Sequence, residues 1–123
     1  MTYLLGIDVG TTGSKAVLID TEGIVRASAT TEYPMYTPRP LWAEQNPSDW
    51  WSATITSIRQ VLSGGDIARQ VAGVGLTGQM HGLVLLDSAG EVLRPCIMWN
   101  DQRTAPQCAA ITEQVGAENV LRL

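Results

Sequence analysis

Residues 8–15 combine the groups that bind a phosphate, and we call them the phosphate loop. Their sequence, Asp-Val-Gly-Thr-Thr-Gly-Ser-Lys, contains a carboxylate, two glycines, three hydroxyls and the only lysine of the chain. Glycine lets the backbone approach a phosphate, and hydroxyl and amide groups donate to its oxygens. Asp8 can hold Mg2+ through the water shell that this ion retains, and Lys15 can neutralise phosphate charge. The loop indicates an enzyme that uses ATP and Mg2+. The expected ATP contacts are Asp8, Gly10, Thr11, Thr12, Gly13, Ser14 and Lys15, with Asp8 as the metal ligand.

This segment is not a P-loop, because the Gly-Lys-Ser/Thr signature is absent and a hairpin, not a helix, is expected after it. The alternative is an ordinary Asp-Gly turn in which the threonines serve β propensity. A lone Gly-Thr-Thr would favour that alternative. The full spacing Asp-x-Gly-Thr-Thr-x-x-Lys, directly after an apolar strand, favours phosphate binding.

A second polar loop, Gly78–Gly82, follows another apolar segment, and we call it the Gln-Met-His loop. Its flanking glycines let the side chains between them project into a cleft. Gln79 and His81 could hydrogen-bond hydroxyl groups, and Met80 could pack on the apolar face of a sugar. The alternative for His81 is a purely structural histidine. A metal site or a triad built on two histidines is excluded, because the chain contains only one.

The third polar cluster, residues 99–103, reads Trp-Asn-Asp-Gln-Arg and lies between an expected strand and an expected helix. Two interpretations stay open. In the first, Asn100 or Asp101 is only a helix N-cap and Arg103 is a solvated base. In the second, Trp99, Asn100, Asp101 and Arg103 line a polyol pocket.

Apolar patterns predict the elements that must position these clusters. Strands are expected at residues 3–9, 14–20, 24–31 and 71–76, and an extended surface loop at 33–47. A hairpin is expected from residues 83–86 and 91–93 around the turn 87–90. Together with the helices described next, these elements predict an α/β fold.

Two helices are expected. The first begins with Asn46 as N-cap, Pro47 at the first helical position and Asp49 at the positive end of the helix dipole. Gly64-Gly65 should end it. The second begins near residues 100–104, where Thr104 and Gln107 could form a capping box, and ends at Gly116. The expected apolar stripes are Trp51, Ile55, Ile58 and Leu62 in the first helix, and Cys108, Ile111 and Val115 in the second.

Residues 17–25 and 84–92 resemble each other, since each runs from an apolar strand through an Asp-x-x-Gly turn into a hairpin. The similarity could reflect an internal repeat or simply the likeness of hairpins. The strands at 3–9 and 71–76 are joined through a helix, so the crossover rule makes them parallel neighbours. The phosphate loop and the Gln-Met-His loop should then meet at the carboxyl edge of the sheet, where α/β folds bind ligands.

The composition excludes several classes of protein. The 123 residues carry a net charge of −4 without a basic run, which argues against a duplex-binding surface. No apolar run approaches the ~20 residues that span a bilayer, and the N-terminus lacks the pattern of a secretory signal. Cys96 and Cys108 have no second metal-type pair, so we expect reduced thiols in a cytoplasmic protein.

The three clusters together resemble the FGGY family of carbohydrate kinases, and within it the xylulose kinase branch. The matching segments, in order, are the phosphate loop, residues 41–47 with Trp50-Trp51, the Gln-Met-His loop and residues 99–103. The resemblance implies a ribonuclease H-like (actin-like ATPase) fold, with a mixed sheet and helices. It also implies phosphoryl transfer from ATP to a small-molecule sugar, giving xylulose 5-phosphate. By resemblance, Asp8, Thr11, Thr12 and Lys15 serve ATP and Mg2+, and the ketose contacts are Gln79, Met80, His81, Trp99, Asn100, Asp101 and Arg103.

Family members are several times longer than this chain and have two actin-like domains around a cleft. We therefore expect residues 1–123 to be the N-terminal part of an incomplete first domain. Its uncovered sheet face or edge would favour self-association, including a homodimer. The catalytic aspartate is expected beyond Leu123, as are the adenine site and the second domain. The isolated chain should therefore be inactive.

Three alternatives to a sugar kinase remain open. The first is an actin-like ATPase or nucleotide switch without a sugar substrate, which the Gln-Met-His loop argues against. The second is a truncated, non-catalytic module that retains a fold. The third is a nuclease of the ribonuclease H-like fold, which would need carboxylate partners for Asp8.

Overall fold

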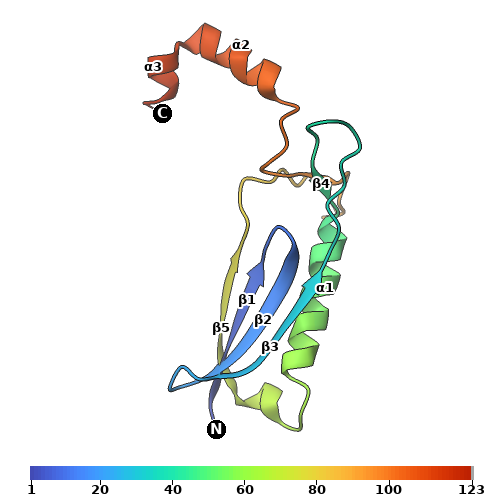
Figure 1. Ribbon diagram of the computed structural model, residues 1–123, viewed down its shortest axis with the longest axis vertical. Helices are drawn as coiled ribbons and strands as arrows, with labels where there is room; N and C mark the ends of the chain where they lie inside the picture. Colours follow the sequence, from blue (N-terminus) through green and yellow to red (C-terminus); the bar gives the residue numbers. More distant parts are fainter. Residues whose placement is uncertain (123) are drawn as a thin grey trace.

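The computed structural model describes residues 1–122, arranged as two small sheets with helices (Figure 1). Most of the expected boundaries agree with the structure to within one or two residues. The strands are β1 (Tyr3–Val9), β2 (Gly13–Asp20), β3 (Val25–Glu32), β4 (Glu44–Gln45), β5 (Val71–Gly78) and β6 (Cys96–Ile97). The helices are α1 (Pro47–Val61), the 3-10 helix η1 (Ile67–Gln70), α2 (Ala105–Val115) and α3 (Ala117–Val120).

The main sheet has the strand order β3-β2-β1-β5, with β1 and β5 parallel and the other pairs antiparallel. The chain passes from β3 to β5 through α1, as the crossover rule requires of parallel neighbours. Val9 lies opposite Gly78, and the Gln79 amide donates to the Val9 carbonyl at 2.9 Å. The phosphate loop and the Gln-Met-His loop therefore leave the same edge of the sheet, which confirms the predicted arrangement.

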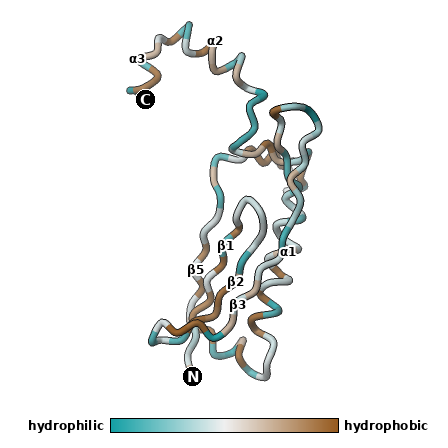
Figure 2. Tube along the Cα trace, in the orientation of Figure 1, coloured by the Kyte–Doolittle hydropathy of each residue, from teal (hydrophilic) through white to brown (hydrophobic). Residues whose placement is uncertain are grey.

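Helix α1 packs against β2 and β3 through small residues and through part of the expected apolar stripe, since Ile58 and Leu62 pack partly buried against the core. Its buried side chains are Ala53, Ser57 and Val61, whereas Trp51 is 69% exposed. The prediction for Trp51 was wrong, because the helix turns its small residues inward and approaches the sheet closely. The core beneath the helix contains Leu5, Ala16, Leu18 and Val61, and Figure 2 shows hydrophobic segments in the sheet around β1.

Helix α1 ends slightly before the expected glycines. Its last residue is Val61 and its C-cap is Leu62, while Gly64 and Gly65 have positive φ values in the turn that follows. At its N-terminus, Asn46 occupies the N-cap position and Pro47 the first turn, as predicted, although the Asn46 side chain makes no capping hydrogen bond. Backbone geometry and the fixed φ of Pro47 therefore set the start of the helix.

A second cluster of buried side chains, Ala43, Cys96 and Met98, forms where β4 pairs with β6. Within the expected hairpin at residues 83–93, only the bridge Leu86–Val92 has strand pairing, so the two predicted strands are too long. The turns of the proposed repeat do match. Asp20 and Asp87 each accept hydrogen bonds from the amides two and four residues later, and the glycine three residues later has a φ of 83° in both.

Helices α2 and α3 extend away from the sheet at the C-terminal end (Figure 1). Thr104 occupies the N-cap position of α2 as predicted, but its side chain makes no capping bond, so the expected capping box with Gln107 is absent. Gly116 ends α2 with a φ of 87°. Within residues 1–122, no helix has the length and apolar character needed to cross a membrane.

Candidate active site

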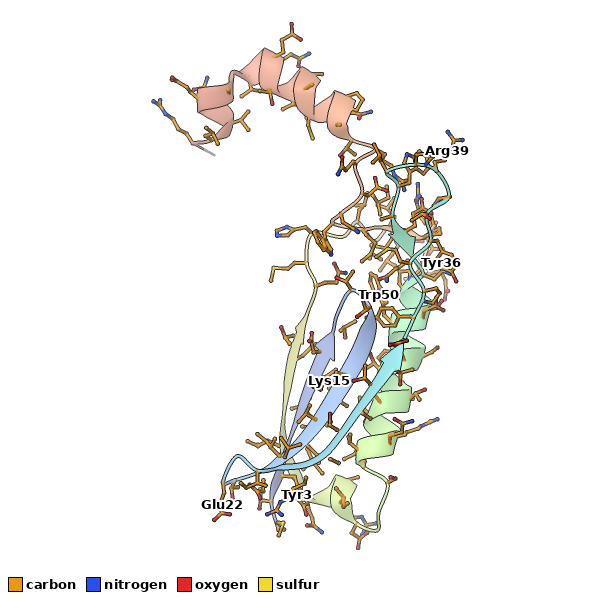
Figure 3. The ribbon with its side chains drawn as sticks, viewed as in Figure 1. Tyr3, Lys15, Glu22, Tyr36, Arg39 and Trp50 are labelled. Atoms are coloured by element: carbon orange, nitrogen blue, oxygen red, sulfur yellow. The ribbon has the colours of Figure 1, made fainter. Side chains whose placement is uncertain are left out.

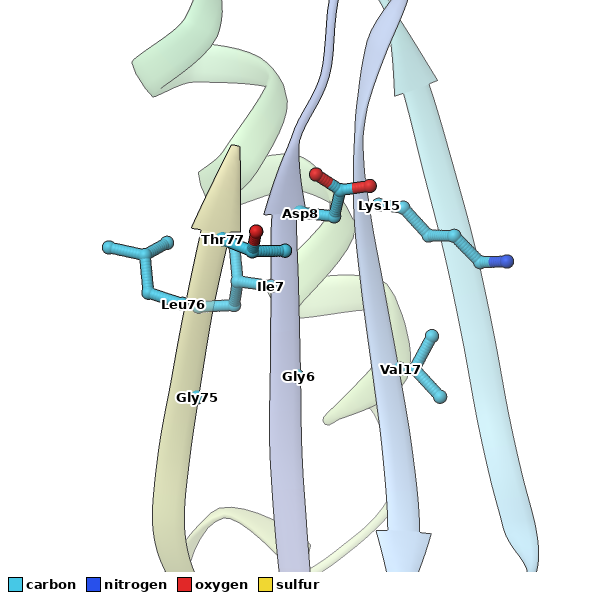
Figure 4. A pocket seen from close by; sticks show the side chains of 8 residues that line it. All are labelled: Gly6, Ile7, Asp8, Lys15, Val17, Gly75, Leu76 and Thr77. Atoms are coloured by element: carbon cyan, nitrogen blue, oxygen red, sulfur yellow. The ribbon is translucent and has the colours of Figure 1, made fainter. Parts of the chain in front are cut away.

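The phosphate loop is a tight hairpin between β1 and β2, closed by a 3.0 Å hydrogen bond from the Gly10 amide to the Gly13 carbonyl. Asp8 lies opposite Lys15 on β2 and Thr77 on β5, and opposed residues in a sheet share a face. Figure 4 shows these three side chains on one face, above an open hollow of about 420 Å³. Among the ion pairs of the described residues, Asp8 and Lys15 take part in none, so both charges are free to face a ligand.

The environment of Asp8 fits a Mg2+ ion that keeps most of its water. Nowhere in residues 1–122 do three or more His, Cys, Asp or Glu side chains gather as a metal site. Asp8 is exposed and offers a single carboxylate, with the Thr77 hydroxyl on the neighbouring strand. Mg2+ is commonly bound through one or two carboxylates, water and substrate phosphates, which matches this donor set.

Ser14 points away from the open side of the phosphate loop. Its side chain is fully buried, and its hydroxyl lies 2.8 Å from the Thr54 hydroxyl of α1. The Ser14 carbonyl accepts a 2.9 Å hydrogen bond from Ser57. Since side chains alternate between the faces of a strand, Ser14 faces the helix while Lys15 faces the hollow. The sequence predicts both residues as ATP contacts, but the alternation directs the Ser14 hydroxyl to α1 and leaves only the Lys15 side chain on the open face.

The Gln-Met-His loop forms one wall of a second open hollow, which we call the Trp99 hollow. Its volume is about 270 Å³. Met80 and His81 are exposed, and the backbone of His81 has a φ of 67°, an uncommon value for a residue with a side chain. The Gln79 Oε1 atom is buried without a hydrogen-bond partner in the described residues. The residues lining the hollow are Thr11, Gln79, Met80, His81 and Trp99.

Gly82 at the end of this loop packs directly on Cys96. A Cβ atom at Gly82 would lie 2.9 Å from the Cys96 Sγ atom, closer than side chains approach one another. Cys96 is fully buried, and burial raises the pKa of its thiol. Cys96 therefore supports the loop as an inert packing residue, a role that its spacing from Cys108 does not reveal.

Trp99 connects the third cluster to the phosphate loop. Its indole Nε1 donates a 3.1 Å hydrogen bond to the Thr11 hydroxyl, across 88 residues of sequence. The Trp99 side chain is otherwise well exposed, so its ring forms an accessible wall of the hollow. The structure thus brings together residues from all three predicted clusters.

Asp101 and Arg103 form a buried ion cluster behind Trp99. Arg103 donates to both carboxylate oxygens of Asp101 and, at 2.8 Å, to Glu44. Its guanidinium lies 3.7 Å from the centroid of the Trp42 ring. The Asp101 carboxylate also accepts a 2.7 Å hydrogen bond from the Ala43 amide.

This network decides against the first interpretation of residues 99–103, a helix N-cap with a solvated base. Asp101 is not the N-cap of α2, because Thr104 occupies that position. Arg103 is not a solvated base, because its side chain is only 10% exposed. Hydrogen bonds from Arg103 lower the pKa of Asp101 to about 2. Asn100 is exposed beside the cluster, and direct sugar contact by Asn100, Asp101 or Arg103 stays a prediction.

The strand order, the parallel β1–β5 pair and the polar hairpin after β1 define a protein of the actin-like ATPase fold. The profile described as "FGGY family of carbohydrate kinases, N-terminal domain" matches residues 3–122. The chain therefore belongs to the FGGY family of carbohydrate kinases.

Among similar proteins, the xylulose kinase of Klebsiella pneumoniae is 47% identical over 113 residues, which are 92% of this chain and 23% of that protein. The xylulose kinase of Bacillus subtilis is 43% identical over 117 residues, covering 94% and 23%. The crystal structure of xylulose kinase from Rhodospirillum rubrum superimposes with a TM-score of 0.89 at 32% identity, covering 94% of this chain and 24% of that one. The chain thus spans about a quarter of the length of the relatives it matches.

Proposed function

We propose that this chain is the ATP- and sugar-binding part of a kinase that phosphorylates a ketose, with D-xylulose as substrate and D-xylulose 5-phosphate as product. The observation that carries the proposal is the Trp99 hollow. It is lined by Thr11 of the phosphate loop and by the three side chains of the Gln-Met-His loop. A phosphate donor on one loop and a hydroxylated acceptor on the other would therefore meet at a single edge of the sheet.

On the nucleotide side, Asp8 and Lys15 supply complementary charges on the face above the open hollow of Figure 4. Lys15 would neutralise phosphate oxygens, and Asp8 would orient the water shell of Mg2+. The ion, when bound, would offset the charge that develops on the transferred phosphoryl group. Positioning and charge neutralisation dominate such a transfer, and this chain supplies groups for both.

On the sugar side, Gln79 lines the Trp99 hollow, and its side-chain amide is of the type that hydrogen-bonds sugar hydroxyls. Met80 and Trp99 offer exposed apolar surface for the carbon face of a sugar, and His81 adds a polar ring at the same wall. The buried ion pair of Asp101 and Arg103 would fix the segment that carries Trp99. The general base is not assigned to Asp8, because its carboxylate would serve the Mg2+ ion.

The test uses a complete kinase that contains this chain, either as encoded by its own gene or as a chimera. In the chimera, residues 1–123 replace the matching segment of the Klebsiella pneumoniae enzyme. Phosphate transfer is measured with D-xylulose, other ketoses and polyols. D-xylulose should give the highest kcat/KM, and isolated residues 1–123 should give no turnover.

Two variants separate the two halves of the proposed site. Asp8→Ala should suppress turnover with every sugar, whereas His81→Ala should raise KM mainly for the preferred sugar. ATP hydrolysis that does not respond to any sugar would instead support a nucleotide switch. A silent His81→Ala variant would refute the assignment of the Gln-Met-His loop to the sugar.

A further inference from the structure

Three consecutive carbonyl groups of the phosphate loop are each held by a residue from the segment between β3 and α1. The Gly10 carbonyl accepts a hydrogen bond from the Tyr33 hydroxyl. The Thr11 carbonyl accepts one from Gln45 Nε2 at 2.7 Å, and the Thr12 carbonyl accepts one from the Tyr33 amide at 3.2 Å. Two residues, Tyr33 and Gln45, thereby fix three successive peptide groups.

The direction of these carbonyls determines the direction of the amides that follow them. In a trans peptide, the C=O of one residue and the N–H of the next point to opposite sides. The chain contains no cis peptide within its described residues, so carbonyls drawn toward Tyr33 and Gln45 turn the next amides the other way. In residues 1–122, neither the Thr11 nor the Thr12 amide donates a hydrogen bond. Free successive amides of this kind can cradle an anion.

Both anchoring side chains are themselves held firmly. Tyr33 is 8% exposed, and burial together with the nearby charge of Asp8 raises its pKa, so the phenol keeps its donor proton. Gln45 is 1% exposed, and its Oε1 accepts a 2.9 Å hydrogen bond from Trp50 Nε1. Figure 3 shows Trp50 at the start of α1, beside the tip of the β1–β2 hairpin. The orientation of the Gln45 amide is thus set from both ends.

We propose that Tyr33 and Gln45 are positioning residues for ATP, which hold the phosphate loop with its amides directed at the nucleotide phosphates. This inference deepens the proposed function and rests on it. The residues themselves touch the loop from behind and need not touch the nucleotide. Their removal should therefore weaken nucleotide affinity more than sugar affinity.

The experiment measures Mg·ADP affinity by calorimetry, and KM for ATP and for the ketose, in the complete kinase. Tyr33→Phe removes one hydroxyl, and its matched control is Tyr36→Phe. Tyr36 is an exposed tyrosine whose hydroxyl makes no hydrogen bond in the described residues. Gln45→Met removes the bond to the Thr11 carbonyl. Its control, Trp50→Phe, removes the bond between Trp50 and Gln45 but keeps an aromatic ring in the second buried cluster and the Gln45 donor for Thr11.

Tyr33→Phe and Gln45→Met should each weaken Mg·ADP binding and raise KM for ATP about three- to tenfold, the usual effect of one lost hydrogen bond. KM for the ketose should change less than twofold, and each control should retain an ADP affinity closer to that of the unsubstituted kinase. A purely structural role would lower thermal stability without this split between ATP and ketose, and that result would overturn the proposal.

Failure of the proposed function has a different signature. A kinase that binds Mg·ADP but phosphorylates no sugar would refute the ketose assignment. The ratio of ADP affinities between each variant and the unsubstituted protein would still support or overturn the positioning role. Equal ADP affinity in all the variants of an active ketose kinase would overturn the positioning role alone. Absence of ADP binding by the unsubstituted protein would overturn both.

Discussion

Substitution of Gly82 tests how the sugar side of the site is held in place. The Cβ of Gly82→Ala would lie 2.9 Å from Cys96 Sγ, at least half an ångström inside an ordinary contact of 3.4–4 Å. The thiol has little room to move away, because Cys96 is completely buried and its backbone is held in β6 opposite Gln45. The loop must move instead. Overpacking of this kind costs about 1–3 kcal/mol of stability.

The displacement also has a kinetic consequence, because Gly82 directly follows His81. A shift of up to 1 Å in a substrate-positioning loop can lower kcat/KM by as much as about a hundredfold. We expect Gly82→Ala to lower kcat/KM for the ketose about tenfold in the complete kinase, through a higher ketose KM and with little change in KM for ATP. The thermal unfolding temperature should fall in parallel.

The chain provides its own control for this prediction. Cys96→Ala removes the sulfur that the new methyl group meets, so the double variant Gly82→Ala/Cys96→Ala should recover most of the lost ketose affinity. Cys108 is exposed on α2, and Cys108→Ala should give no recovery. Contacts of adjacent groups are commonly coupled by about 0.5–3 kcal/mol in such cycles. Additive effects of Gly82→Ala and Cys96→Ala would refute the packing argument.

Two further predictions concern Trp99 and the ion cluster behind it. Trp99→Phe keeps an aromatic wall but removes the N–H that bonds Thr11, so KM for ATP should rise about two- to fivefold. The control is Trp51→Phe, at an exposed site on α1. Equal KM values for ATP in the Trp99→Phe variant and the unsubstituted kinase would contradict the role of this bond. Hydrogen bonds from Arg103 hold the pKa of Asp101 at about 2, below the unfolded value of about 3.9. The ionised Asp101 therefore stabilises the folded state above about pH 4, and this contribution is lost as the pH falls toward 2. Over that pH range, the free energy of unfolding measured with urea should fall by about 1–2 kcal/mol, and Asp101→Asn should remove this decrease. Identical pH profiles of the unsubstituted protein and the Asp101→Asn variant would contradict this prediction.

The sheet was predictable from the sequence because its determinants are local. The strands β1, β2, β3 and β5 each follow from a short apolar pattern bounded by turn residues. The parallel pairing of β1 with β5 follows from a connection rule that needs only the presence of a helix between them. Those two inferences were sufficient to place the phosphate loop beside the Gln-Met-His loop.

The failures arose where tertiary contact overrides a local pattern. Trp51 fits the spacing of an apolar stripe, yet α1 turns Ala53, Ser57 and Val61 toward β2 and β3 and leaves Trp51 exposed. The sequence predicts Ser14 as a phosphate contact beside Lys15, yet Ser14 lies on the buried face of β2 and its hydroxyl bonds Thr54. In both cases, helix packing determined which face a residue occupies.

The roles of Tyr33, Gln45 and Trp99 toward the phosphate loop had no local signal at all. Tyr33 lies 23 residues from Gly10, Gln45 lies 34 residues from Thr11, and Trp99 lies 88 residues from Thr11. A loop rich in glycine has little conformational preference of its own, so the groups that orient it must come from elsewhere in the fold. Thr11 receives two such groups, Gln45 on its carbonyl and Trp99 on its hydroxyl. Because Trp99 also lines the hollow proposed for the sugar, a ketose that packs on the Trp99 ring would contact a side chain bonded to Thr11, which is a proposed ATP contact.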